Sequence, residues 1–391
     1  MIQKTVYLDN AATTRVNPLV VEAMNPYFNE FYANPSSLHQ KGREARLAIE
    51  KAREQVASLL GADPKEIIFT SGGTESDNLA IFGTAYANRS KGNHIITSQI
   101  EHHAVLNSCH QLEKQGYEVT YLPVDSAGAV VTKELEKAIK KETILVTIMH
   151  SNNEVGTIQP LDEIAGICAS KRALLHTDAV QSVGKIRFNL QKSKINLLSL
   201  TAHKFYGPKG VGVLYIRKGT KINPLQVGGH HEFRRRAGTE NTPGIIGLAK
   251  AMDLAYKEMD ATNKRMIELR DRLREELSNK IDEIKINGNI EKWLPHILNI
   301  SFNYVEGESI LLNLDSSGIC VSSGSACSSE SLEPSHVLSA MHVPVEIAHG
   351  AIRFSLGRET TKEEIDFTIE TVAGVIKRLR EMSPLYKKRE A

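Results

Sequence analysis

Short apolar runs rich in β-branched residues alternate with segments of helical spacing through the first half of the chain. Seven such runs lie at residues 66–70, 94–97, 118–122, 144–149, 173–177, 195–200 and 211–216. The intervening segments, such as 132–140 and 161–170, are long enough for the helical crossovers that parallel strands require. This alternation predicts an α/β fold with one large, mostly parallel, seven-stranded sheet and helices on both of its faces.

Two longer segments carry apolar residues on one helical face. In segment 37–60 these residues are Ala45, Ala48, Ala52, Val56 and Leu59, and Gly61 is positioned to end the helix. After residue 255, a charged segment repeats the pattern with Met266, Leu269, Leu273, Leu277 and Ile281. We expect this second helix to lead into a second, smaller domain.

Composition narrows the class of protein. The chain has 391 residues, of which 41% are hydrophobic, and this is enough for more than one buried core. Its 48 basic and 46 acidic residues leave a net charge of +2, which gives no electrostatic basis for binding nucleic acid or an anionic membrane. No membrane-spanning stretch or apolar signal segment is evident. We expect a cytoplasmic protein whose partners are small molecules or other proteins.

Two of the predicted strands are followed by residues with the chemistry of a cofactor site. Asp178 follows the run at 173–177, and Lys204 follows the run at 195–200. Ligands of open α/β sheets bind beyond the carboxyl ends of the strands. Each residue alone has an ordinary explanation, a turn cap for Asp178 and a surface position for Lys204. Together they match pyridoxal phosphate, which needs a lysine for its Schiff base and an acid for its pyridinium nitrogen.

The segment after the first run is suited to an anion. Gly72 and Gly73 lead into a helical pattern, so the N–H groups of Gly73, Thr74 and Glu75 would face a phosphate at a helix N-terminus. A tight turn without a ligand is an equally good interpretation, and the missing GK[ST] ending argues against an NTPase. His102, after the second run, has the chemistry to stack on a flat ring and move protons, or is a structural histidine.

A second candidate for chemistry is the segment SSGSACSSESLEP at 322–334, which surrounds Cys327 with small polar residues typical of a mobile loop. Its thiol is a candidate nucleophile if its surroundings favour the thiolate. Arg353 stands within an apolar strand pattern, where a substrate carboxylate or an internal salt bridge would satisfy its guanidinium. The other cysteines are expected to be buried helix residues (Cys109, Cys168) and a strand residue (Cys320).

Ten segments occur in an order that resembles the cysteine desulfurases, pyridoxal-phosphate enzymes of aminotransferase fold type I, class V. They are YLDNAATT, NPSSLHQKGREA, TSGGTESDN, EHHAVLN, NNEVGTIQP, HTDAVQSVGK, TAHKFYGPKGVG, RAGTEN, SSGSACSS and IRFSLGR. The similarity spans essentially the whole chain. The length and sequence of the cysteine segment resemble those of group I enzymes, which supply sulfur for iron-sulfur clusters and thiolated tRNA.

The resemblance implies a role for each candidate residue. Lys204 would hold the cofactor as a Schiff base, Asp178 would pair with its ring nitrogen, and His102 would stack on the ring. Further cofactor contacts would come from Gln181, Asn153, Gly73, Thr74, Thr201 and His203, with Thr239 reaching the phosphate of the other subunit. Substrate would be bound by Arg353, Asn10 and Asn153, and Cys327 would be the catalytic nucleophile. No metal site is expected, because the histidine pairs lack the spacing of a helical zinc site.

The implied reaction converts L-cysteine into L-alanine and a persulfide on Cys327, which then passes to a sulfur-acceptor or iron-sulfur scaffold protein. The resemblance also implies a homodimer with composite sites. It implies a large cofactor-binding domain at 16–257, and a small α+β domain that comprises 1–15 and 258–391 and carries the cysteine segment. A selenocysteine lyase or another class V aminotransferase would use the same lysine and aspartate, whereas a non-enzymatic scaffold would bind no cofactor.

Overall fold

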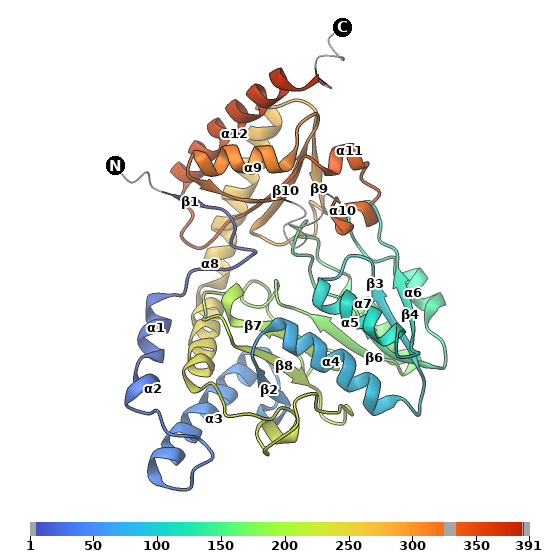
Figure 1. The fold of residues 1–391 in the computed structure, drawn as a ribbon, viewed down its shortest axis with the longest axis vertical. Coiled ribbons are helices and arrows are strands. Elements are labelled where there is room, and N and C mark those ends of the chain that lie inside the picture. Colours follow the sequence, from blue (N-terminus) through green and yellow to red (C-terminus); the bar gives the residue numbers. More distant parts are fainter. Residues whose placement is uncertain (1–4, 324–333, 385, 387–391) are drawn as a thin grey trace.

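The computed structural model describes residues 5–323, 334–384 and 386. A seven-stranded sheet forms its larger part, with the strand order β2-β8-β7-β6-β5-β3-β4 (Figure 1). The strands are β2 (Ile67–Thr70), β3 (His94–Ser98), β4 (Glu118–Leu122), β5 (Thr143–Thr147), β6 (Leu174–Asp178), β7 (Leu197–Thr201) and β8 (Gly212–Ile216). Of these seven strands, β8 alone runs in the opposite direction to the other six. The predicted α/β fold is confirmed, and each predicted run matches a strand to within two residues.

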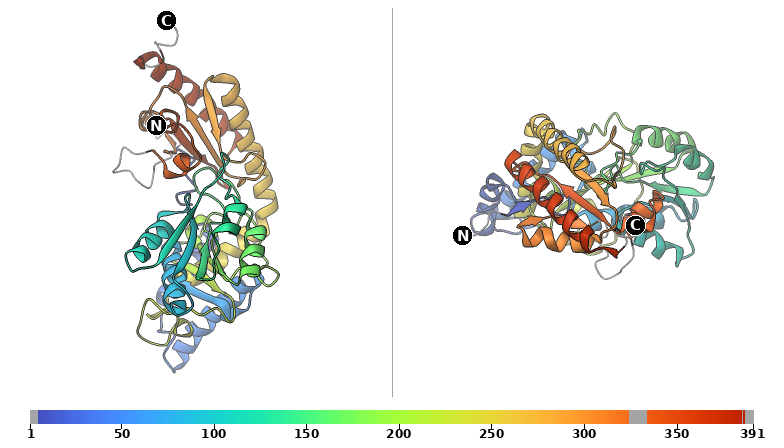
Figure 2. Two further views of the ribbon diagram at one scale, coloured as in Figure 1. Left: turned by 90° about the vertical axis from the view of Figure 1, so that its right-hand side faces the viewer. Right: turned by 90° about the horizontal axis from the view of Figure 1, so that it is seen from above.

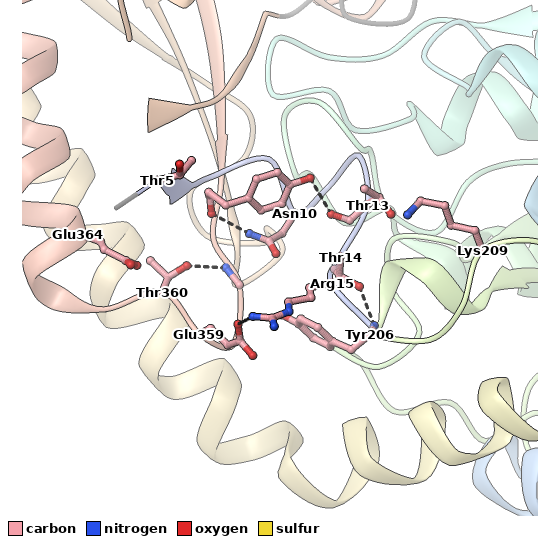
Figure 3. Close-up of a pocket in the computed structure, with 12 residues that line it drawn as sticks. Thr5, Asn10, Thr13, Thr14, Arg15, Tyr206, Lys209, Glu359, Thr360 and Glu364 are labelled. Carbon is pink, nitrogen blue, oxygen red and sulfur yellow. Dashed lines mark hydrogen bonds and ion pairs between the residues drawn. The ribbon is translucent and has the colours of Figure 1, made fainter. Parts of the chain in front are cut away.

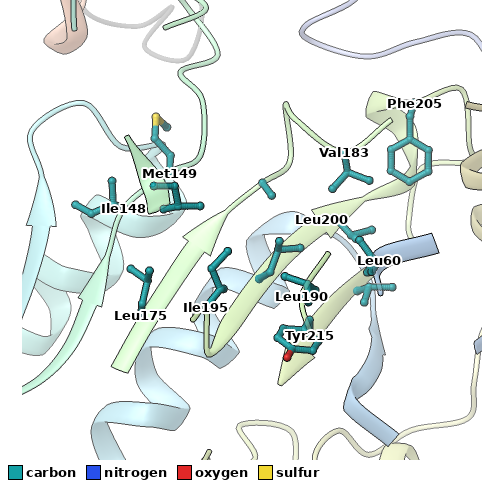
Figure 4. Packing of buried hydrophobic residues seen from close by; sticks show 14 of the residues in the cluster. Leu60, Ile148, Met149, Leu175, Val183, Leu190, Ile195, Leu200, Phe205 and Tyr215 are labelled. Carbon is teal, nitrogen blue, oxygen red and sulfur yellow. The ribbon is translucent and has the colours of Figure 1, made fainter. Parts of the chain in front are cut away.

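Helices cover both faces of this sheet. They are α3 (Gln40–Leu60), α4 (Gly73–Asn88), α5 (His103–Glu113), α6 (Thr132–Ala138), α7 (Leu161–Lys171) and the first half of α8 (Thr242–Lys280). Because successive strand residues point to opposite faces, Ile95 and Leu197 pack with α4 and α5, whereas Ile96 and Leu198 join the core on the other face. Figure 4 shows part of this second core, around Leu200 and Tyr215.

Helix α3 differs in detail from the sequence pattern. It begins after His39, whose side chain accepts a hydrogen bond from the Gly42 N–H, and ends at Gly61 in the left-handed conformation, with φ 62°. Its fully buried apolar residues are Ala45, Ile49, Ala52, Val56, Ala57 and Leu60. The predicted positions Ala48 and Leu59 are half-buried, and Leu59 packs against the large core. Ile49 and Leu60, which the pattern did not include, are buried in that core.

A four-stranded antiparallel sheet forms the smaller part, in the order β12-β13-β10-β9. Its strands are β9 (Ile284–Asn287), β10 (Ile297–Phe302), β12 (Ser322–Ser323) and β13 (Ala351–Ser355). Helices α9 (Gly307–Ser316) and α12 (Lys362–Met382) pack in the core of this part. Helices α10 (His336–Ala340) and α11 (Val345–Ala348) instead contribute Val337, Leu338 and Ala348 to the core of the larger part. The N-terminal strand β1 (Val6–Tyr7) pairs with β11 (Ile319–Cys320), so the start of the chain packs beside its C-terminal part.

Helix α8 connects the two parts as one continuous helix, which Figures 1 and 2 show along one side of the molecule. Its first half, including Leu248 and Met252, lies in the large core, and its second half, including Leu273 and Leu277, lies in a separate core with the small sheet. The helix begins at Thr242, earlier than the charged segment predicted. We propose that the domains divide within it, at 257/258, shortly before the helix passes from the large core, which includes Met259, to the small core, which includes Leu269. Among the described residues, no helix combines the length and apolar character needed to cross a bilayer.

Candidate active site

The carboxyl ends of β6 and β7 open onto a cavity of about 430 Å³. Ten of the thirteen residues singled out in the sequence line it: Gly73, Thr74, His102, Asn153, Asp178, Gln181, Thr201, His203, Lys204 and Arg353. They come from both sheets and from the loops between them. The sequence also missed several lining residues, among them Asp9, Asp77, Met149, Ser151 and Ser322.

Lys204 ends a short 3₁₀ turn (Ala202–Lys204) that directly follows β7. Its Nζ donates hydrogen bonds to the carbonyl oxygens of Ala11 at 2.6 Å and Ala12 at 2.8 Å. The backbone N–H and the Oγ1 of Thr14 both donate to the His203 carbonyl, each at 2.9 Å. The N-terminal segment therefore lies across the turn and orients the lysine side chain.

Asp178 is the last residue of β6, and its Oδ1 accepts a hydrogen bond from the Val180 N–H at 2.8 Å. Burial raises the pKa of this carboxyl to about 6, although the Val180 hydrogen bond and the charge of Lys204 act in the opposite direction. Asp77 of α4 lines the same cavity, and burial together with the charge of Asp178 raises its pKa well above the usual value. A cationic group beside these carboxyls would offset the cost of their burial.

The N-terminus of α4 forms the candidate phosphate site. A Cβ atom on Gly73 would lie 2.9 Å from Cγ2 of Val180, so the helix start requires a glycine to pack this closely. Thr74 follows it. Thr201, the last residue of β7, and His203 of the 3₁₀ turn Ala202–Lys204 (the lysine turn) face the same cavity. Burial and the charge of Lys204 lower the pKa of His203 to about 4. The site therefore offers backbone N–H groups, the Thr74 hydroxyl and a neutral imidazole, and the Thr201 hydroxyl beside them donates to the Val211 carbonyl at 3.1 Å.

His102 caps the N-terminus of α5 on the cavity wall. Its Nδ1 accepts a hydrogen bond from the Ala104 N–H at 3.1 Å, which assigns the proton of the neutral ring to Nε2. Burial and the charge of Lys204 lower the pKa of His102 to about 4. The ring is thus neutral near pH 7 and offers its Nε2–H at the cavity.

Arg353 of β13 is buried on the side of the small sheet. Its Nη1 donates to the Asn153 carbonyl at 3.0 Å, and its Nη2 pairs with Asp9 Oδ1 at 2.8 Å. Its buried Nε has no hydrogen-bond partner among the described residues. Of the two alternatives from the sequence, the internal salt bridge therefore exists, and Nε remains available to an additional acceptor.

Three predicted residues lie elsewhere. The Asn10 side chain donates to the carbonyls of Tyr7 and Ser355 and lines a neighbouring cavity of about 530 Å³, shown in Figure 3. Thr239 is exposed and does not line the cavity of its own chain. Cys327 lies outside the described residues. The roles of all three stay predictions.

Two of the missed residues carried a signal in the sequence. Asp77 follows Gly73 by four residues, so helical spacing would have placed both on the same face of α4. Asp9 lies in the motif YLDNAATT, but only the folded chain brings it to Arg353, 344 residues away. The predicted buried positions of Cys109 and Cys168 are confirmed, as is the strand position of Cys320.

Comparison with known proteins places this site in a family. A model of the Aminotransferase class-V family matches residues 6–367. The chain belongs to the class V aminotransferases. Within that family it is 56% identical over 383 residues to "Cysteine desulfurase IscS" of Dictyoglomus turgidum, covering 98% of this chain and 97% of the relative.

Two further matches support the placement. "Cysteine desulfurase IscS" of Methanosarcina thermophila is 55% identical over 98% of this class V chain and 95% of its own length. A solved structure titled "NIFS-LIKE PROTEIN" is 44% identical, with a TM-score of 0.91 over 96% of this chain and 100% of its own. This class V chain is therefore a member of the cysteine desulfurases and has their fold type I architecture.

Proposed function

We propose that the chain is a pyridoxal-phosphate-dependent cysteine desulfurase, which removes sulfur from L-cysteine to give L-alanine and a persulfide on Cys327. The observation that carries the proposal is the convergence of Lys204, Asp178, His102 and Arg353 on one cavity. The 56% identity to an IscS cysteine desulfurase supports it.

The donor set of the cavity fits the cofactor. Lys204 has the amine for its aldehyde, Asp178 the carboxyl for its ring nitrogen, and the start of α4 with Thr74, Thr201 and His203 the donors for its phosphate. The Gln181 Nε2 donates to the Ala11 carbonyl at 2.8 Å, while its Oε1 is buried and has no partner among the described residues. A hydroxyl beside the ring would satisfy this atom. When bound, the cofactor supplies an electron sink for negative charge at the substrate α-carbon.

Each of the chain's own side chains then has a separate role in the reaction. Arg353, which lines the cavity, binds the substrate carboxylate, and Asp9 keeps the guanidinium in place. The freed amine of Lys204 moves the α-proton, and the neutral ring of His102 handles the thiol proton. The Cys327 thiolate attacks the substrate sulfur, so that an S–S bond forms and the C–S bond breaks. The electron pair left on carbon is protonated, which gives alanine.

A homodimer with shared sites is part of the proposal. The arm formed by α1 (Pro18–Met24), α2 (Pro26–Asn29) and the loop that follows exposes large apolar side chains. They include Leu19, Phe28 (63% exposed), Tyr32 (71%) and Leu38. Such a patch on a monomer indicates a protein interface. Pairing of two chains would let the exposed Thr239 reach the phosphate site of the partner.

The persulfide sulfur then leaves with an acceptor protein, for iron-sulfur cluster assembly, tRNA thiolation or both. The proposal on cluster assembly is supported by the relatives named IscS. A partner protein rather than nucleic acid itself is the expected recipient, because the chain's net charge of +2 provides no phosphate-binding excess.

The test starts with the visible spectrum of the purified protein before and after addition of L-cysteine, with alanine and sulfide assayed in the same sample. A band that shifts with cysteine, accompanied by both products, supports a desulfurase. Cys327→Ser should keep the colour and lose sulfide release, whereas Cys320→Ser, as a matched control, should keep both. Sulfide release by the Cys327→Ser protein at the wild-type rate would contradict the proposal.

A further inference from the structure

Lys185 lies beside the candidate site, in a position where an ammonium group is costly. Its side chain is buried, and its Nζ donates a hydrogen bond at 3.0 Å to the backbone carbonyl of Lys204. Lys185 does not line the cavity, and the reaction proposed above gives it no step. A buried lysine destabilises the fold unless its surroundings compensate. Its contact with the turn that carries Lys204 therefore needs a functional explanation.

The backbone around Lys185 is shaped to approach that turn closely. Gly184 has a φ of +81°, and a Cβ atom there would lie 2.7 Å from the Cβ of Phe205, the residue after Lys204. The Lys185 N–H donates to the Ser182 carbonyl at 3.0 Å, and Asn263 of α8 donates to the Lys185 carbonyl at 2.7 Å. Both peptide groups of Lys185 are thus held, and only its side chain reaches Lys204.

The surroundings of Lys185 bring the pKa of its amine close to neutral pH. Burial and the charge of Lys204 lower the pKa of Lys185 to about 7. Burial lowers the pKa of His203 to about 4, with Lys204, Lys209 and Lys185 contributing. Burial also lowers the pKa of His296 well below its usual value, and the charges of Lys185, Arg353, Arg270 and Lys204 act in the same direction. Both histidines therefore stay neutral near pH 7.

The remaining ionisable groups around Lys204 line the cavity. His102 is neutral near pH 7, since its pKa is lowered to about 4. The pKa of Asp178 is raised to about 6, and that of Asp77 is raised well above its usual value, in both cases chiefly by burial. Both carboxyls are on the cavity wall, whereas Lys185 contacts the backbone of the lysine turn itself.

We propose that Lys185 is a positioning residue for Lys204. Its hydrogen bond fixes the carbonyl of the turn, so that the Lys204 side chain is presented to the cavity. An amine held in this orientation is placed to bond to an aldehyde or to accept a proton. This inference rests on the proposed function, in which Lys204 reacts with pyridoxal phosphate.

The test measures how fast the cofactor-free protein takes up pyridoxal phosphate at a series of pH values, followed by absorbance. Lys185→Met removes the donor to the Lys204 carbonyl, whereas Lys185→Arg retains a donor at this position. We expect Lys185→Met to slow uptake by about tenfold at every pH in the series, the equivalent of one hydrogen bond. Lys185→Arg should restore most of the wild-type rate.

Lys209→Met is the matched control, because it replaces a lysine at an exposed position on the segment after the lysine turn, and its uptake rate should equal that of the wild type. Thermal unfolding shows that each variant is folded. A wild-type rate in the folded Lys185→Met protein overturns the inference. Failure of the wild-type protein itself to take up pyridoxal phosphate would instead contradict the proposed function.

Discussion

The two sides of the cavity are built in different ways. One side comes from neighbouring elements of the seven-stranded sheet: the ends of β6 and β7 and the start of α4 supply Asp178, Lys204 and Gly73. The other side comes from the four-stranded sheet and the N-terminal segment, where Arg353 and Asp9 meet across 344 residues of sequence. The first side is fixed by regular backbone, and the second by long-range polar contacts.

This difference indicates which part of the proposed reaction each side of the cavity carries out. The large-sheet side has the buried groups suited to one permanent occupant, the cofactor. The small-sheet side presents Arg353 and Ser322 and continues directly into the segment 324–333, which contains Cys327 and lies outside the described residues. In the proposed reaction, substrate selection and sulfur transfer belong to this second side. Variants on the two sides should therefore fail in different ways.

Lys204→Ala removes the reactive amine from the large-sheet side of the cavity and has the largest expected effect. Without the amine, the cofactor has no covalent attachment and the α-proton has no base, so kcat should fall by at least about a thousandfold. Sulfide assays and the visible spectrum measure both losses. The matched control Lys209→Ala, an exposed lysine five positions later, should behave as wild type. Substantial turnover by the Lys204→Ala protein would assign the chemistry to another residue.

Arg353→Lys alters the small-sheet side of the cavity and should leave cofactor binding unchanged. Lysine keeps the charge but loses the fork geometry that binds Asp9, the Asn153 carbonyl and a carboxylate together. We expect KM for cysteine to rise by about 10- to 100-fold, the equivalent of one charged hydrogen bond, with an unchanged cofactor spectrum. Arg187→Lys, at an exposed ion pair with Asp260, serves as control. A changed spectrum with unchanged KM would place Arg353 with the cofactor instead.

The contrast between the two sides also explains what the sequence could predict. The strands of the large sheet follow one another as β-branched runs, so the positions of Asp178 and Lys204 at their ends could be inferred from local pattern alone. Arg353 was identified as an unusual charge in a strand, but its partner Asp9 depends on how the N-terminal segment crosses the molecule. Lys185 carried no local signal, because its burial results from the packing of Gly184 against Phe205.

Ser335→Ala tests the small-sheet side where the described chain resumes. The Ser335 Oγ accepts hydrogen bonds from the N–H groups of Val337 and Leu338 at the start of α10, and donates to the buried Glu154. Loss of this cap should lower the free energy of unfolding by about 1 to 2 kcal/mol. Urea unfolding measures it, with Ser278→Ala, at an exposed helix position, as control. Equal stability of both variants would show that the cap contributes nothing.

Glu101→Gln tests the large-sheet side through the pH dependence of its stability. The Glu101 carboxylate oxygens are buried and accept hydrogen bonds from the Met149 N–H, and burial raises the pKa of the carboxyl to about 8. The folded protein thus holds a proton that the unfolded chain releases near its ordinary pKa of 4.5. The stability from this group is fully present below about pH 4.5 and is lost as the pH rises through about 8.

The slope of this loss is at most about 1.4 kcal/mol per pH unit, the limit for one proton. Glu101→Gln carries a neutral amide at every pH, so its free energy of unfolding should fall less steeply than that of the wild type between about pH 5 and 8. Glu163→Gln, at an exposed position of α7, should retain the wild-type slope because water solvates that carboxylate in both states. Parallel pH profiles for the Glu101→Gln and wild-type proteins would mean that the folded protein accommodates Glu101 as a carboxylate. In that case the large-sheet side tolerates a buried charge as readily as the small-sheet side tolerates Arg353.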